Sequence, residues 1–242
     1  MAKSKKGHTV IAVGDIQFPF QHRDMIPFLK AVIKEFKPDR MVQIGDLADQ
    51  YFANAWGKST KAQSARDEFE TFLEQLHGEF LPLFKKMKKT IIIGNHDERI
   101  YKRADEAGIP DFVLKSMKDL YQLPKDIDLV YDVQIDGVTY VHGHTTKCSA
   151  ANATEVLTYE YETPVVYGHF HSCAGINYLA NKRRLVWGFN LGCLIDVNAY
   201  AFEYGRAYKN KPILGVGLVI NGQPIYVPML IGNNHRWTGK LK

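Results

Sequence analysis

The chain has 242 residues, of which 45% are apolar and 24% are charged. These are the proportions of a globular protein, and they exclude extensive disorder; the apolar runs are also too short to cross a bilayer, so we expect no membrane association. The net charge of +5 permits an anionic substrate but does not by itself establish a nucleic-acid partner.

The first half of the chain alternates between strand and helix patterns. Three β-branched runs predict strands, and each ends in a glycine followed by polar residues: 8–15, 40–46 and 90–97. Two segments between them have apolar residues at helical spacing: 23–39 and 65–87. Asp24 is a candidate cap of the first helix, and Gly78 and Pro82 should weaken or kink the second. Residues 50–64 have no clear period and predict a loop. Repeated strand–helix units imply a largely parallel, buried sheet.

The second half is rich in strand patterns. Residues 128–144 form two alternating runs around Asp136-Gly137, and residues 213–230 form two more around Asn221-Gly222; both predict hairpins. Two further runs predict strands, the first of them ending in histidines: 164–172 and 183–196. No linker separates the halves. We therefore expect one α/β domain, residues 1–242, with two sheets.

The N-terminus and the cysteines point to the cytoplasm. The N-terminal segment is basic but lacks the apolar core of a secretory signal. Cys148, Cys173 and Cys193 show no paired spacing and are typical of free thiols in a reducing compartment. We therefore expect a cytoplasmic protein, and the sequence leaves its oligomeric state open.

Polar side chains gather where the predicted strands end. The carboxyl ends of strands in an open α/β sheet meet at one edge, so we expect these side chains to converge. Carboxylates, amide oxygens and imidazoles are ligands of divalent first-row metals such as manganese, iron and zinc, and the absence of a thiolate argues against structural zinc. The set exceeds the needs of one ion, whereas two ions with a shared carboxylate would use it fully: Asp15, Gln17, Asp46, Asp49, Asn95, His96, Asp97, His142, His144, His169 and His171.

Five short blocks occur in order along the chain: "DIQ" (15–17), "GDLAD" (45–49), "GNHD" (94–97), "VHGH" (141–144) and "GHFH" (168–171). This series resembles the calcineurin-like metallophosphoesterases, whose pattern is D-x-H, G-D-x-x-D, G-N-H-D/E, a single H, and G-H-x-H. The resemblance covers roughly residues 8 to 195. It implies a four-layer αββα sandwich, with two mixed β-sheets flanked by helices, and an enzyme that hydrolyses phosphoester bonds.

The resemblance also implies the roles of individual residues. The metal ligands would be Asp15 and His171 for the first ion, Asp46 for both ions, and Asn95, His142 and His169 for the second. A hydroxide between the ions would attack phosphorus, and manganese is the expected metal, with iron, zinc and nickel as alternatives. His96 would act as general acid or charge stabiliser beside the leaving oxygen, and Asp49 would hold its orientation.

Gln17 departs from the family pattern, which usually has histidine at this position. Three outcomes follow from the weaker donor strength of an amide oxygen. Gln17 either binds the first ion directly and favours a hard ion such as manganese, or acts through a water molecule, or leaves a weak first site that fills only with substrate.

Three further site residues have alternative interpretations. His144 competes with His142 as the metal ligand of the fourth block, and is otherwise a residue that lines the site. Arg99 either clamps a phosphate with its planar fork or is a surface arginine on the next helix. Asp97 is expected to be a structural partner of its own turn.

The blocks define the reaction type rather than the substrate. The loop after Asp49 carries three aromatic and two basic residues, which favours a phosphodiester such as a nucleotide or nucleic acid, unless these aromatic residues pack a lid: Tyr51, Phe52, Trp56, Lys58 and Lys61. A second tyrosine series has helical spacing and is more typical of packing than of base stacking: Tyr200, Tyr204 and Tyr208. A phosphomonoesterase acting on small metabolites or phosphoproteins, and a non-catalytic binding scaffold, remain as alternatives.

Overall fold

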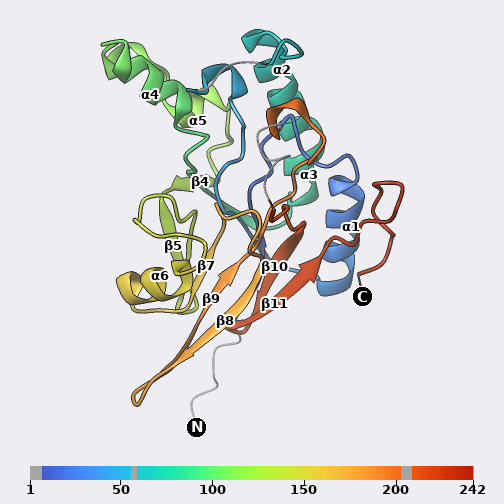
Figure 1. Cartoon of the computed structure of the whole chain (residues 1–242), viewed down its shortest axis with the longest axis vertical. Coiled ribbons are helices and arrows are strands. Elements are labelled where there is room, and N and C mark those ends of the chain that lie inside the picture. The colour runs from blue at the N-terminus through green and yellow to red at the C-terminus, as the bar shows by residue number, and fades with distance from the viewer. Residues whose placement is uncertain (1–6, 56–58, 203–208, 242) are drawn as a thin grey trace.

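Two mixed β-sheets pack face to face in the computed structural model, which describes residues 7–55, 59–202 and 209–241 (Figure 1). The first sheet has the strand order β11-β10-β1-β2-β3-β4 and is parallel from β1 to β4 and antiparallel from β1 to β11. The second has the order β5-β6-β7-β9-β8, with β6, β7 and β9 parallel. The expected pair of mixed sheets is therefore confirmed.

The elements follow one another closely along the described chain. The strands are β1 (Thr9–Val13), β2 (Arg40–Gln43), β3 (Lys88–Ile92), β4 (Ile127–Val130), β5 (Asp132–Ile135), β6 (Val138–Val141), β7 (Val165–Tyr167), β8 (Gly175–Ala180), β9 (Leu185–Asn190), β10 (Gly215–Ile220) and β11 (Gln223–Pro228). The helices are α1 (Met25–Phe36), α2 (Ala65–Gln75), α3 (Leu81–Leu83), α4 (Arg99–Glu106), α5 (Met117–Leu120) and α6 (Ala153–Tyr161). Three single turns complete the series: η1 (Tyr51–Ala53), η2 (Leu76–Phe80) and η3 (Asp111–Val113).

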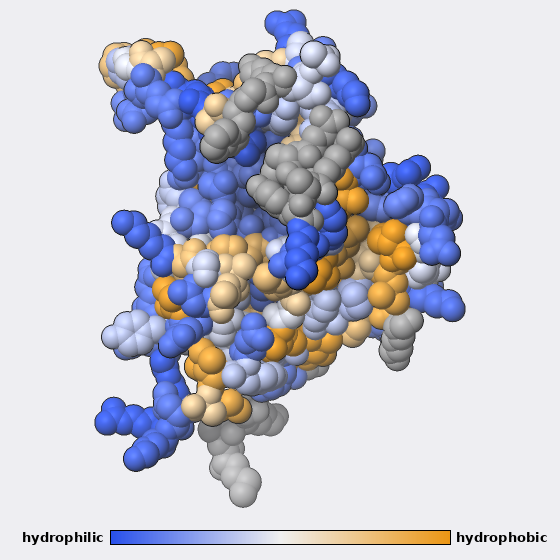
Figure 2. All heavy atoms as spheres, in the orientation of Figure 1, coloured by the Kyte–Doolittle hydropathy of each residue, from blue (hydrophilic) through white to orange (hydrophobic). Residues whose placement is uncertain are grey.

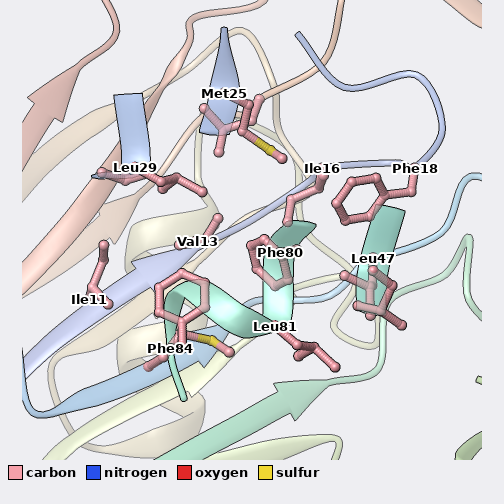
Figure 3. Close-up of a cluster of buried hydrophobic side chains, with 14 of the residues drawn as sticks. Ile11, Val13, Ile16, Phe18, Met25, Leu29, Leu47, Phe80, Leu81 and Phe84 are labelled. Atoms are coloured by element: carbon pink, nitrogen blue, oxygen red, sulfur yellow. The ribbon is translucent and has the colours of Figure 1, made fainter. Parts of the chain in front are cut away.

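Alternate residues of the strands face two different cores, which explains the layered arrangement. Ile11 and Val13 of β1 face a cluster with α1 and the α2–α3 segment, whereas Val10 and Ala12 face the second sheet. Figure 3 shows the first cluster, in which side chains from α1 and from the segment around α3 gather beside β1: Val13, Met25, Leu29, Phe80 and Phe84. A third cluster packs α6 on the outer face of the second sheet. The order helices, sheet, sheet, helix is the predicted four-layer sandwich.

The second predicted helix is interrupted where the sequence suggested. A π-helical turn, η2, separates α2 from α3, and it contains Gly78. Pro82 lies in the first turn of α3, and the helical segment ends at Leu83 rather than continuing to residue 87. The kink is therefore confirmed, and the helix is shorter than predicted because β3 begins at Lys88.

The predicted cap of the first helix is right in position only. Asp24 occupies the N-cap position of α1, but its side chain makes no capping hydrogen bond. Instead its carboxylate accepts hydrogen bonds from the guanidinium of Arg236 and the backbone N–H of Trp237, so it fastens the C-terminal segment to α1. The predicted hairpin at Asp136-Gly137 is confirmed by the antiparallel pairing of β5 with β6, but it is shorter than the run 128–144, because β4 belongs to the first sheet. The hairpin at Asn221-Gly222 is confirmed by the pairing of β10 with β11.

None of the described helices is long and apolar enough to cross a membrane.

Candidate metal centre

The strand ends bring the predicted ligands to one edge of the two packed sheets. Each site residue follows a strand, and the strands are adjacent in the two sheets: Asp15 and Gln17 after β1, Asp46 and Asp49 after β2, Asn95 and His96 after β3, His142 after β6, and His169 and His171 after β7. Hydrophilic residues cover the face below α4 in Figure 2, and strand β9 points toward this side of the molecule in Figure 1. Residues from 15 to 171 thus form one site.

Two groups of ligand atoms lie close together, and they share Asp46. Nitrogen and carboxylate oxygen atoms within 4.8 Å of one another come from Asp15, Asp46 and His171 in one group, and from Asp46, His142 and His169 in the other. In the first group, His171 Nε2 lies 3.0 Å from Asp15 Oδ1. One shared carboxylate between two groups is the arrangement expected of a two-ion centre.

Gln17 belongs to the first group by position. Its side chain is fully buried, and its amide nitrogen Nε2 lies 3.4 Å from Asp46 Oδ2 and 3.5 Å from His171 Nε2. Its amide oxygen Oε1 is buried without a hydrogen-bond partner. A half-turn about the last side-chain torsion exchanges these two atoms and directs the oxygen between Asp46 and His171.

His142 anchors the second group. Its Nδ1 donates a hydrogen bond to the Ile44 carbonyl at 2.8 Å, which directs Nε2 toward the site. There Nε2 lies 3.4 Å from Asp46 Oδ2 and 3.1 Å from Asn95 Oδ1. His144 lies outside this group, since its Nε2 faces Glu98 Oε2 at 3.4 Å. The geometry favours His142 over His144 as the ligand.

The donor set fits divalent ions. Ligand atoms that are each about 2.1 Å from one ion are separated by about 3.0–3.4 Å from one another, and the separations between Asp15 and His171, and between His142 and its two neighbours, are of this size. Asp15 and Asp46 are buried carboxylates, and within the described residues their only cationic partners are histidines. Buried anions need a counter-charge, which metal ions would supply.

Four site residues adopt a strained backbone. Asp15, Gln17, Asp46 and His169 have φ between 49° and 69°, in the left-handed region that residues other than glycine rarely enter. Each such residue costs on the order of 1 kcal/mol or more. These turns aim the side chain that follows each strand back over the sheet edge, so local stability is lost to place the ligands.

The charges of the site are strongly coupled. Burial alone would raise the pKa of Asp46, but His142 and His96 beside it hold that pKa well below its ordinary value. Burial alone would lower the pKa of His142, yet the Asp46 carboxylate raises it to about 10. Burial and the neighbouring His142 charge lower the pKa of His169 to about 4. The charges of Asp46 and His142 therefore stabilise each other.

His96 and Arg99 form a second arrangement beside the ligands. His96 Nδ1 lies 3.6 Å from Asp49 Oδ2, and Nε2 lies 3.7 Å from Asp46 Oδ2. Burial opposes protonation of His96, but the charges of Asp46 and Asp49 raise its pKa overall. Arg99 is the first residue of α4, and its side chain points into the site. Its Nη1 donates to the Asp49 carbonyl and carboxylate at 2.8 Å, and its Nη2 lies 2.9 Å from His96 Nε2.

Comparisons with known proteins show the family to which the chain belongs. A model of the family described as calcineurin-like phosphoesterase matches residues 8–183. The chain belongs to this family. It is 24% identical over 244 residues to the Gene 54 protein of Mycobacterium phage L5, covering 92% of this chain and 94% of that relative. Similar solved structures include Vps29 of Chaetomium thermophilum (9% identity, 97% and 94% of the two chains, TM-score 0.49) and the nuclease MPE of Pseudomonas putida (13% identity, 90% and 86%, TM-score 0.39).

The aromatic residues beside the phosphoesterase site mainly pack against one another. Tyr51 is buried, its ring lies edge-on to Phe20 and Tyr200, and its hydroxyl accepts a hydrogen bond from the Ser59 N–H. Neither Tyr51 nor Tyr200 is therefore an open stacking platform. Trp56, Lys58, Tyr204 and Tyr208, which the sequence singled out, lie outside the described residues.

Sequence reasoning missed two residues whose side chains fix the turns that carry candidate metal ligands: Gln43 and Asn190. The Gln43 side chain bonds both the N–H and the carbonyl of Gly45, which fixes the turn before Asp46. Asn190 donates to the Phe170 carbonyl and accepts from the Gly192 N–H, which holds the turn between His169 and His171. A buried amide at the last position of an apolar strand is the signal that identifies both residues.

Proposed function

We propose that this chain is a metal-dependent phosphoester hydrolase whose two divalent ions share Asp46. Asp15, Gln17 and His171 complete the first site, and Asn95, His142 and His169 complete the second. The observation that carries the proposal is the presence of one buried carboxylate in two ligand groups. Manganese is the proposed metal, because Gln17 adds a hard amide oxygen to carboxylates and imidazoles; iron, zinc and nickel are the alternatives.

The ions would neutralise the phosphoryl oxygens and lower the pKa of a water molecule, which becomes the nucleophile. The side chains supply the rest of the chemistry. His96 donates a proton to the leaving oxygen, and Asp49 faces its Nδ1 and orients the ring. Arg99 would bind substrate through the N–H groups that remain, since Nη1 is engaged by Asp49 and Nη2 also lies 2.9 Å from His96 Nε2.

We further propose that the substrate is a phosphodiester, such as a nucleotide or a nucleic acid strand. The support is the net charge of +5, together with Phe52, which is half-buried, and Lys61, which is exposed, in the loop that follows Asp49. The packed state of Tyr51 limits base stacking in this loop. A monoester on a small metabolite or a phosphoprotein remains the alternative substrate.

The test begins with metal-stripped protein reconstituted with manganese, nickel, zinc or magnesium. Hydrolysis of bis-p-nitrophenyl phosphate and of p-nitrophenyl phosphate is then compared. We expect manganese-dependent turnover that favours the diester. A clear preference for the monoester would overturn the diester assignment alone, and a protein that binds manganese but cleaves neither would act as a scaffold.

His96→Ala separates chemistry from metal binding. Loss of a general acid typically costs about 10²–10⁴-fold in rate. We expect a loss of this size on alkyl esters, a smaller loss on nitrophenyl esters that leave without a proton, and unchanged metal content. Loss of bound manganese in this variant would contradict the role assigned to His96.

A further inference from the structure

The second ion site depends on two separate loops that must keep a fixed spacing. Asp46 lies in the loop 44–50 after β2, and Asn95 lies in the turn 93–98 after β3. Ligands need placement within about 0.5 Å for productive binding. Two strands in one sheet fix their own backbones, but residues beyond the strand ends need other contacts.

Asp97 provides the direct link between these loops. Its carboxylate accepts hydrogen bonds from the Gly94 N–H in its own turn, and from the N–H groups of Leu47 and Ala48 in the other loop, at 2.9, 3.3 and 3.1 Å. The structure thus shows Asp97 as the partner of its own turn that the sequence suggested, and adds the neighbouring loop. The position of this carboxylate sets the spacing between the loops.

Two side chains hold Asp97 in place from behind. The Tyr121 hydroxyl donates to Asp97 Oδ1 at 2.9 Å. Gln50 Nε2 donates to the Tyr121 hydroxyl and to the Asp97 carbonyl, both at 2.9 Å, and Gln50 Oε1 accepts from the Ile100 N–H at 2.9 Å. All three side chains are buried, and each polar atom of the Tyr121 and Gln50 side chains has a partner. Such closed networks are strengthened by the low dielectric around them.

Tyr121 connects this network to the helical layer. Its ring lies edge-on to Phe72 of α2, with centroids 4.7 Å apart. His77, in the π-helical turn η2, donates from Nε2 to the Tyr121 carbonyl at 3.0 Å. The π-helical turn between α2 and α3 therefore helps to hold this tyrosine in position. The ring fixes the hydroxyl against a packed surface, with little freedom to move.

We propose that Tyr121 and Gln50 are positioning residues of the second ion site: they hold Asp97, and through it keep Asp46 and Asn95 at the spacing that one ion requires. This proposal rests on one part of the proposed function, namely that the site binds divalent ions. The hydrogen bonds place both residues behind the ligands and not among them, so their effect reaches the ion through loop spacing.

The test uses Tyr121→Phe, which removes one hydroxyl and keeps the packed ring. Loss of an outer hydrogen-bonding partner typically lowers metal affinity about 10–100-fold. Manganese chloride titrated into the metal-free full chain by calorimetry should show the second site weakened by this factor and the first site, which shares only Asp46 with it, weakened less. Gln50→Met, which removes the second member of the network at similar volume, should weaken the same site.

Tyr226→Phe is the matched control, because it also loses one phenol hydrogen bond, to the Leu214 carbonyl, but lies in β11 at the far edge of the first sheet. It should bind two manganese ions as the wild type does. The inference is overturned if Tyr121→Phe and Gln50→Met bind both ions with wild-type affinity, or weaken both sites no more than the control. If the wild type binds no manganese, the proposed function falls as well, so the two failures are distinguishable.

Discussion

Gly94→Ala is the sharpest test of how closely the ligand loops approach each other. A Cβ atom on Gly94 would lie 2.1 Å from the Asp46 backbone nitrogen and 2.2 Å from Asp46 Oδ1. Real Cβ atoms essentially never lie closer than 3.0 Å to another atom. The distance from the new Cβ to the Asp46 backbone nitrogen must therefore grow from 2.1 Å to at least 3.0 Å, which pushes the two loops apart. The neighbours are backbone and a buried ligand, which cannot rotate away.

The displacement has two measurable consequences. Overpacking of this kind typically costs about 1–3 kcal/mol of folding free energy. The shift also breaks the 2.8 Å hydrogen bond from the His96 N–H to Asp46 Oδ1, and misplacing a reacting group by about 1 Å typically costs on the order of 10²-fold in rate. Because Asp46 belongs to both candidate ligand groups, we expect both manganese affinities to fall by at least about tenfold.

Calorimetric manganese titration and urea unfolding measure these effects, with two glycines as controls. A Cβ on Gly168 would lie 2.3 Å from Asp15 Oδ2, so Gly168→Ala should weaken mainly the first site. A Cβ on Gly78 has no atom within 4 Å, so Gly78→Ala should raise stability by up to about 1 kcal/mol and leave manganese binding unchanged. Native affinity at both sites in Gly94→Ala would refute the account of the site as two loops in backbone contact.

Three further predictions concern single side chains. Gln17→His should tighten manganese or zinc binding at the first site, and an unchanged titration would show that Gln17 is not a ligand. Burial raises the pKa of Glu68 to about 7, so the native state should lose about 3 kcal/mol between pH 4.5 and 8 as this carboxyl ionises; Glu68→Gln should flatten that part of the urea-unfolding profile, and equal slopes would contradict the assignment. Arg236→Ala should lower the free energy of unfolding through loss of its hydrogen bonds to Asp24 without changing manganese binding; altered metal affinity would contradict a purely structural role for this pair.

The convergence of the candidate ligands was predictable because each one follows a strand. In a parallel sheet the direction of the chain fixes which end of every strand is shared, so residues such as Asp15, Asp46 and Asn95 converge whatever connects them. The local sequence also shows the glycine turns, and it shows the alternation of apolar residues by which successive side chains of a strand face one core or the other. These features explain why the sandwich and the ligand set can be inferred from the amino-acid sequence alone.

Other features depend on contacts that no local pattern encodes. The run 128–144 alternates throughout, but alternation does not reveal that β4 and β5 join different sheets. Tyr121 follows a helix of only four residues, too short to show a period, and its partners lie 71 and 24 positions away. The role of Asp24 depends on Arg236 at the other end of the chain. Tertiary packing decides such cases, and a single sequence does not record it.

The candidate ligands are held by contacts with one another and with the backbone. The Asp46 carboxylate raises the pKa of His142 to about 10, and His142 and His96 lower the pKa of Asp46. Hydrogen bonds from the His96 N–H to Asp46 and from the loop N–H groups to Asp97 hold the turns in place. A histidine must be neutral to bind a metal ion, so metal affinity should fall as His142 gains its proton, and it should depend on how rigidly the surrounding residues hold the candidate ligands.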